Sequence, residues 1–281
     1  MKTLRTISAY LFIALAVSSL LYTEYQKQPD GKLHVYFFDV GQGDATLLVS
    51  PSGKQVLIDG GPNLDALEQL GNHMPFFDRS IDLLVLTHPD ADHLTALPDV
   101  LRRYDVQRVL ISGVQSSSGR YQALLDAIRQ QQIPVLLADP DSDIDLGDGI
   151  TLDVIWPPPG LLGKTVRNKN DTSVVIRVLG GKQSILLTGD IEKDAEAAIL
   201  NMKTDVRADI LKVAHHGSKT SSTQAFLEAV HPNAVIISAG RDNRFGHPHP
   251  SVTGRFQQLG YEIRNTATEG MIALEIEMLG Y

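Results

Sequence analysis

The sequence predicts an α/β domain, α+β in some schemes, built as a four-layer αββα sandwich. A strand hairpin followed by alternating helices and strands occurs twice along the chain. In both copies a Gly-Lys-Gln turn leads through a strand to an aspartate, Asp59 in the first and Asp190 in the second. Two similar halves would pack sheet against sheet with their helices outside. Strand ends from both halves would then meet at one edge.

The individual elements follow from apolar runs bounded by Gly, Pro and Asn turns. In the first half we expect strands at 33–40, 45–49, 55–58, 81–86, 106–112 and 134–137, with helices at 63–71, 94–104 and 119–132. An acidic turn region, 139–149, separates the halves. In the second half we expect strands at 151–155, 173–179, 184–187, 210–214 and 234–238, with helices at 192–202, 223–230 and 251–259.

Composition limits the function classes. The 281 residues are 43% hydrophobic and 21% charged, an ordinary globular balance. A net charge of -8 excludes a generally basic surface, so an anionic substrate must be held by local cations or by metal. With 0 Cys, a metal site must use histidines and carboxylates. The absence of cysteine also suits a periplasmic protein.

The N-terminus resembles an export signal. Lys2 and Arg5 precede an apolar run from Ile7 to Tyr22, so residues 1–23 are predicted to be a signal peptide or a membrane anchor. Residues 24–31 are predicted to be a linker, and 32–281 one folded domain. Positive charge ahead of the apolar run places the domain outside the cytoplasm. We expect an exported, periplasmic protein, held at the inner membrane if the segment is retained.

A dense group of metal-binding residue types follows the strand at 81–86. Residues Thr87 to His93 have the spacing H-x-D-x-D-H, with two imidazoles and two carboxylates. Such a loop at a strand end could bind a pair of divalent ions. The alternative is an acidic turn with two surface histidines, since Asp and His are common in turns. The density of the group favours the metal site.

Three more polar clusters lie at predicted strand ends: 170–173, 188–190 and 215–218, the last followed by His247 and His249. Because strand ends meet at one edge, their joint placement favours a single site. His34, His73 and His231 are interpreted as structural or surface residues.

The ordered motifs resemble a known family. They are 38–44 (FDVGQGD), 58–61 (IDGG), 87–93 (THPDADH), 170–173 (NDTS), 187–190 (LTGD), 215–218 (HHGS) and 246–248 (GHP). From about Leu33 to the C-terminus the chain resembles the metallo-β-lactamase fold. It is most similar to the extracytoplasmic nuclease-like domain of ComEC-type competence proteins. The resemblance implies the αββα sandwich with a one- or two-metal site between its sheets.

The resemblance also implies a role for each matching residue. The metal ligands would be His88, Asp90, Asp92, His93, Asp171, Asp190 and His247. Asp190 would bridge two ions, Asp92 would also orient the attacking water, and His216 would protonate the leaving oxygen. Asp59 and His215 would support the ligands. Substrate would be bound by Asn170, Ser218, Lys219 and Arg241.

Carboxylates at 90 and 171, where the wider fold has histidines, shift the expected preference from Zn²⁺ toward harder ions. We expect one or two divalent ions, Mn²⁺ or Zn²⁺ before Mg²⁺. A basic group, Lys164, Arg167 and Lys169, is either a solvated turn or a substrate contact.

The predicted function is that of an exported metal-dependent phosphodiesterase or nuclease, with single-stranded DNA as a candidate substrate and DNA uptake as a candidate role. One alternative is a hydrolase of another ester or amide, such as a lactonase or β-lactamase. The other is a non-catalytic module that binds DNA or a partner. Nothing in the sequence predicts an obligate protein partner.

Overall fold

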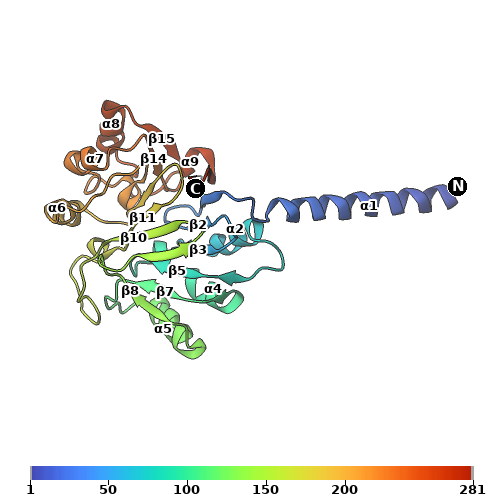
Figure 1. Cartoon of the computed structure of the whole chain (residues 1–281), viewed down its shortest axis with the longest axis horizontal. Coiled ribbons are helices and arrows are strands. Elements are labelled where there is room, and N and C mark those ends of the chain that lie inside the picture. Colours follow the sequence, from blue (N-terminus) through green and yellow to red (C-terminus); the bar gives the residue numbers. More distant parts are fainter. Residues whose placement is uncertain (1, 280–281) are drawn as a thin grey trace.

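A computed structural model describes residues 2–279 and has the predicted layers. Within that range two seven-stranded sheets face each other, and helices cover both outer faces (Figure 1). One sheet is covered by α2 (Asp65–His73), α3 (Ala91–Leu94), α4 (Leu97–Arg103) and α5 (Gly119–Gln131). The other is covered by α6 (Lys193–Asn201), α7 (Gln224–Val230) and α8 (Pro250–Leu259). The four-layer αββα sandwich is confirmed.

The first sheet contains the strands of the N-terminal half. Its order is β16 (Ile272–Ile276), β1 (Leu33–Phe37), β2 (Thr46–Val49), β3 (Gln55–Ile58), β5 (Leu83–Leu86), β7 (Val109–Ile111) and β8 (Val135–Leu137). Strands β16 to β3 are antiparallel neighbours, whereas β3, β5, β7 and β8 run parallel. A separate short pair joins β4 (Ser80–Ile81) and β6 (Asp105–Val106).

The second sheet repeats this plan. Its order is β15 (Glu262–Asn265), β14 (Ala234–Ile237), β13 (Ile210–Lys212), β12 (Ile185–Leu187), β11 (Val175–Leu179), β10 (Ile150–Trp156) and β9 (Ile144–Gly147). Strands β9 to β12 are antiparallel, and β12 to β15 are parallel. The carboxyl ends of the parallel strands in both sheets therefore open onto one edge of the sandwich, where loops can bring side chains together.

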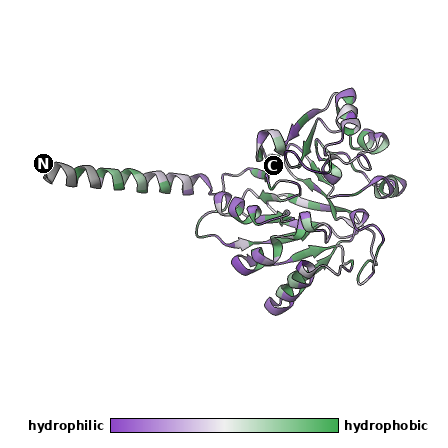
Figure 2. Cartoon of the chain, turned by 180° about the vertical axis from the view of Figure 1, so that it is seen from behind, coloured by the Kyte–Doolittle hydropathy of each residue, from purple (hydrophilic) through white to green (hydrophobic). Residues whose placement is uncertain are grey.

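Apolar side chains fill the space between the layers. Val35 and Val85 from the first sheet pack in one cluster with Ile176 and Ile185 from the second. Separate clusters lie between each sheet and its helices. Figure 2 shows the apolar strands inside and hydrophilic residues on the outward turns of the helices. Burial on both faces explains why the central strands read as continuous apolar runs.

The structure differs from the predicted elements at several points. Strands β15 and β16 were not predicted, and β16 leaves the second half to pair with β1 in the first sheet. The helix predicted at 94–104 is divided into α3 and α4, and β9 lies within the predicted acidic turn region. Two short 3-10 turns, η1 (Asn170–Thr172) and η2 (Ala214–Gly217), and α9 (Thr266–Glu269) complete the domain.

The N-terminal segment is one helix, α1 (Lys2–Gln26), which projects away from the domain (Figure 1). It runs through Gln26, so the first residues of the predicted linker are helical. Its end touches the domain, because Glu24 Oε2 accepts a hydrogen bond from the Phe76 amide at 2.7 Å. Over residues 2–279, no helix has the length and apolar character of a membrane span. Export stays a prediction.

Candidate metal centre

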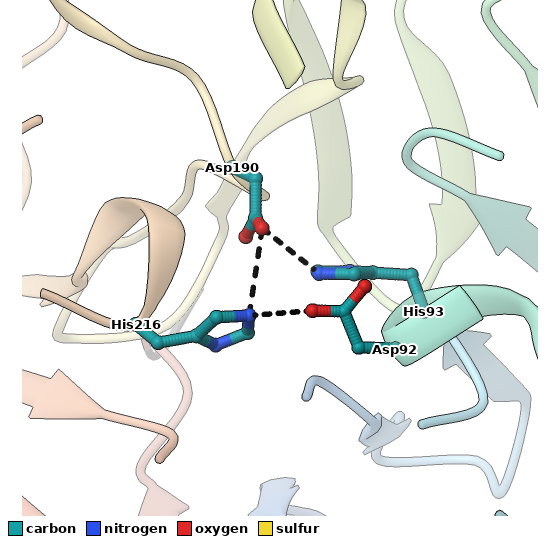
Figure 3. Close-up of side chains that lie close together, drawn as sticks. All are labelled: Asp92, His93, Asp190 and His216. Atoms are coloured by element: carbon teal, nitrogen blue, oxygen red, sulfur yellow. Dashed lines mark ion pairs between the residues drawn. The ribbon is translucent and has the colours of Figure 1, made fainter. Parts of the chain in front are cut away.

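Four side chains from both halves converge at the shared edge (Figure 3). Asp92 and His93 follow β5, Asp190 follows β12 and His216 follows β13, and one ligand atom from each lies within 4.8 Å of the others. Asp190 Oδ2 is 3.2 Å from His93 Nε2 and 3.4 Å from His216 Nε2. His216 Nε2 is also 3.4 Å from Asp92 Oδ2. The centre therefore exists only when the two sheets pack together.

Both histidines of this cluster are held with Nε2 inward. His93 Nδ1 lies 2.7 Å from Asp59 Oδ2, and Asp59 is itself fixed by the Thr87 amide and hydroxyl at 2.8 and 2.7 Å. His216 Nδ1 lies 2.9 Å from the Ser238 carbonyl. When Nδ1–H donates outward, Nε2 keeps a lone pair for a metal. The predicted orienting role of Asp59 agrees with this geometry.

Unpartnered polar atoms show that the cluster fits a cation. In the part of the chain that the structure describes, Nε2 of His88, His93 and His216 and Oδ1 of Asp190 are buried without a hydrogen-bond partner. Buried polar atoms are nearly always paired in folded proteins. Three imidazole nitrogens and a carboxylate oxygen gathered in this way match the ligand types of Zn²⁺ and related divalent ions.

His88 extends the cluster toward a second position. Its Nε2 is 3.9 Å from both Asp190 Oδ2 and Asp90 Oδ2, so Asp190 lies between His88 and His93, as a bridging ligand would. Burial lowers the pKa of His88 to about 4, which leaves the imidazole neutral and able to bind metal at pH 7. Asp90 is less available than predicted, because its other oxygen forms an ion pair with Lys169.

Asp171 is engaged in hydrogen bonds, and its predicted ligand role stays a prediction. Its Oδ1 accepts a hydrogen bond from the Glu192 amide at 2.8 Å, and its Oδ2 accepts one from Asn168 at 2.9 Å. These bonds tie η1 to the start of α6, and Asp171 is absent from the converging group of four. The donor set is consequently less rich in carboxylate than the sequence predicted.

His247 lies beside the cluster, with its ring centre 6.5 Å from that of His216. It is absent from the converging group of four, although its Nδ1 is buried without a partner. Burial, with His215 and His216 nearby, lowers its pKa to about 4. Its ligand role stays a prediction.

The structure places the rings of His215 and His216 differently from the prediction. His216 was expected to face the leaving group, but its side chain is only 1% exposed and is part of the ligand cluster. His215 is 22% exposed at the rim, with Nδ1 3.1 Å from Glu192 Oε1 and Nε2 3.9 Å from Asp190 Oδ2. Consecutive left-handed backbone angles, φ 49° and 55°, separate the two rings. Such strained turns persist where packing enforces them.

The carboxylates of the cluster are ionised. Although burial opposes this, the neighbouring His216 imidazole lowers the pKa of Asp92 to about 2. Burial likewise opposes protonation of His93 and His216, yet Asp190 raises both pKa values well above the usual range, with Asp59 acting on His93 and Asp44 on His216. The metal-free cluster therefore holds protons where a cation would bind.

Of the predicted substrate-binding residues, Asn170 and Arg241 lie beside histidines at the edge of this centre. Asn170 Nδ2 is 3.5 Å from His215 Nδ1, and Lys219 is exposed close to it in sequence. Arg241 lines a cavity of about 560 Å³ that also includes His247. Ser218 is buried, and its hydroxyl bonds to Thr220 at 2.9 Å. Substrate contact stays a prediction for all four.

Three residues near the cluster have no role predicted from the sequence: Asp44, Lys212 and Glu192. Lys212 Nζ lies 2.6 Å from Asp44 Oδ2, and both side chains are buried. A lysine inside an apolar strand is a signal that could have been used, because buried lysine is rare unless paired. The sequence carries no comparable signal for Glu192.

Comparison with known proteins agrees with this architecture. The sequence profile of the Metallo-beta-lactamase superfamily matches residues 38–241. "ComE operon protein 3" of Bacillus subtilis is 31% identical over 85% of this chain, and "Recombination protein 2" of Haemophilus influenzae is 31% identical over 92% of it. The matches cover 32% and 30% of those proteins, so the chain spans about a third of their length.

Solved structures share the fold at low identity. YhfI, a metallo-beta-lactamase fold protein of Bacillus subtilis, superposes with a TM-score of 0.56 at 14% identity, covering 86% of this chain and 99% of that one. Zn²⁺-bound PqqB of Methylobacterium extorquens superposes with a TM-score of 0.52 at 11% identity, with the same coverage. Together with the match over 38–241, the architecture shows that the chain belongs to the metallo-β-lactamase superfamily.

Proposed function

We propose that this protein is a metal-dependent phosphodiesterase that cleaves nucleic acid. The observation that carries the proposal is the pair of His215 and Glu192 at the rim, with His215 Nε2 3.9 Å from Asp190. It puts a partly exposed imidazole beside a cluster suited to cations. Phosphodiester hydrolysis needs both parts, namely positive charge at the phosphoryl oxygens and a proton for the leaving oxygen.

The ligands divide into two groups around Asp190. His93, His216 and Asp92 would hold one ion with Asp190, and His88 would hold a second. Bound there, a divalent ion supplies Lewis-acid polarisation of a phosphoryl oxygen and lowers the pKa of water. This donor set combines three imidazole nitrogens with the carboxylates of Asp92 and Asp190. Zn²⁺ therefore suits the site as well as Mn²⁺.

The chain's own residues perform the remaining work. Asp92 is 33% exposed, so its carboxylate can orient a water molecule at the open side of the cluster. His215 would donate its proton to the leaving oxygen, while Glu192 holds the ring in position. Thr220 in turn fixes Glu192 through a hydrogen bond of 2.8 Å to Oε1. His216 contributes as a ligand.

The relatives support nucleic acid as the substrate class. The names "Recombination protein 2" and "Competence protein ComA", the latter from Neisseria gonorrhoeae, refer to DNA recombination and competence. We also propose that the basic and apolar N-terminus, residues 1–23, directs export and brings the protein to the membrane if it is retained. The substrate class and the export are both proposals that family membership alone does not establish.

The deciding experiment combines metal analysis with hydrolysis of bis(p-nitrophenyl) phosphate and single-stranded DNA, with Mn²⁺ or Zn²⁺ added. Asp92→Asn should bind less metal and lose activity, whereas Asp126→Asn, an exposed carboxylate on α5, should behave as wild type. Equal cleavage by wild type and Asp92→Asn would reveal a contaminant and end the proposal. Hydrolysis of a lactone or β-lactam alone would favour the other hydrolase class.

A further inference from the structure

A basic loop connects the metal centre with a separate cavity. Lys164 and Arg167 are exposed and lie in the connection between β10 and β11. The whole chain carries a net charge of -8, and these two exposed cations add local positive charge to the connection. Near a centre proposed to act on phosphodiesters, such cations can attract the substrate backbone.

The cavity measures about 570 Å³, within the range of ligand pockets. Amide groups of Gln115 and Gln122 line it, and Leu125 and Leu162 provide apolar surface. Leu162 is 66% exposed although it is a large apolar residue. Apolar side chains beside glutamines suit an unstacked nucleobase, which offers a hydrophobic face and a polar edge.

Strand pairing places this cavity beside the metal loop. Ile111, which lines the cavity, pairs in parallel register with Leu86, two residues before His88. Strands β5 and β7 therefore both end at the same edge of the sheet. Two backbone hydrogen bonds join the cavity walls. The backbone N–H of Gln115 donates to the Lys164 carbonyl at 2.8 Å, and the backbone N–H of residue 163 donates to the carbonyl of residue 113 at 2.9 Å.

The same loop then reaches the centre. Thr165 lines the cavity, and four residues later Lys169 forms an ion pair with Asp90 of the metal loop. Four residues span at most about 14 Å. Next along the chain, Asn170 approaches His215. The loop thus forms a continuous path from the cavity past the two cations to the rim.

We infer that this path binds a single-stranded nucleic acid outside the metal centre. Lys164 and Arg167 contact backbone phosphates, and the cavity receives a base. The inference rests on the proposed function and adds how a long substrate is held. A paired base could not enter the cavity, so single strands are bound in preference to duplex.

Steady-state kinetics of the full chain test this. KM is measured for oligothymidylates from the dinucleotide to roughly twelve nucleotides, a span typical of strand-binding sites, and for bis(p-nitrophenyl) phosphate. In the wild type, KM should fall with length. In Lys164→Ala/Arg167→Ala, the ratio of the long-oligonucleotide KM to the small-substrate KM should rise several-fold. The slope of log binding constant against log salt concentration should shrink in magnitude by about one per cation removed.

Lys182→Ala is the matched control, since Lys182 is exposed in the turn before β12, at the opposite edge of the sheet. Leu162→Ser tests the cavity and should raise KM for long substrates without altering the salt slope. Fluorescence anisotropy of a labelled oligothymidylate with EDTA measures binding when cleavage is blocked.

A KM independent of length, with the double variant equal to Lys182→Ala in kinetics and binding, would overturn the inference even if the small phosphodiester is hydrolysed. A different outcome is that no phosphodiester is hydrolysed but the double variant still loses oligonucleotide binding. That outcome would overturn the proposed function and still support the binding path.

Discussion

Lys212 Nζ lies 2.6 Å from Asp44 Oδ2, and this buried ion pair joins the two sheets directly beneath the metal centre. Asp44 precedes β2 of the first sheet, and Lys212 ends β13 of the second. The other Asp44 oxygen is 3.3 Å from His216 Nδ1. The contact that connects the halves therefore also touches a candidate ligand.

Removing one member of this pair should destabilise the protein strongly. Lys212→Met leaves a buried Asp44 carboxylate without its counter-charge, a change that typically costs about 3–5 kcal/mol of unfolding free energy. Urea unfolding of the metal-free protein measures it. Lys182→Met should have little effect, and Asp44→Asn combined with Lys212→Met should recover part of the loss. An unchanged midpoint in Lys212→Met would show that the pair does not hold the sheets together.

Asp59 should control metal affinity without touching the metal. Asp59→Asn keeps the shape but weakens the hydrogen bond that orients His93. Loss of such a partner typically weakens metal binding roughly 10–100-fold. Competition with a chromogenic chelator gives the affinity, with Asp126→Asn as the matched control. Wild-type affinity in Asp59→Asn would argue against His93 as a ligand.

Replacing His215 should lower kcat most for substrates whose leaving group must be protonated. His215→Asn is the suitable variant, because the backbone there is left-handed (φ 49°) and asparagine tolerates that region. For oligonucleotides kcat should fall roughly 10²–10⁴-fold, whereas p-nitrophenolate leaves without protonation and its ester should be much less affected. Glu192→Gln should follow the same pattern more weakly. Equal losses on both substrates would place His215 outside proton transfer.

Metal binding should release protons. In the metal-free protein, the Asp190 carboxylate together with Asp59 or Asp44 holds the pKa values of His93 and His216 well above the usual range, so both rings are protonated at neutral pH. Metal must displace these protons, and apparent affinity should therefore increase as pH rises. Calorimetry in buffers of different ionisation enthalpy counts the protons. The test covers about pH 6 to 8, a range that brackets the ordinary histidine pKa. A metal affinity that stays constant over this range would contradict this arrangement.

Much of the centre could be predicted from local sequence. Asp92, His93 and Asp190 follow apolar strands directly, and turns at strand ends place such residues at the sheet edge whatever the distant packing. The doubled order of hairpins and helices likewise predicted two facing sheets. The alternation and turn signals that support these predictions span only a few residues each.

The placements that the sequence did not predict depend on packing between segments far apart in sequence. His215 and His216 are adjacent in the chain, and only the left-handed turn decides which ring enters the cluster. Asp171 lies in a motif that resembles a ligand position, but its two carboxylate oxygens accept hydrogen bonds from Glu192 and Asn168. No local pattern contains those partners.

By itself, then, the sequence determined the sandwich, the edge that carries the site and the residue types that bind metal, because strand periodicity and turn chemistry are local properties. Only the tertiary structure decided which histidine enters the cluster, that β16 completes the first sheet, and that Lys212 neutralises Asp44. These outcomes are set by the burial of charge and by the pairing of distant strands, whose energies depend on what surrounds each group after folding.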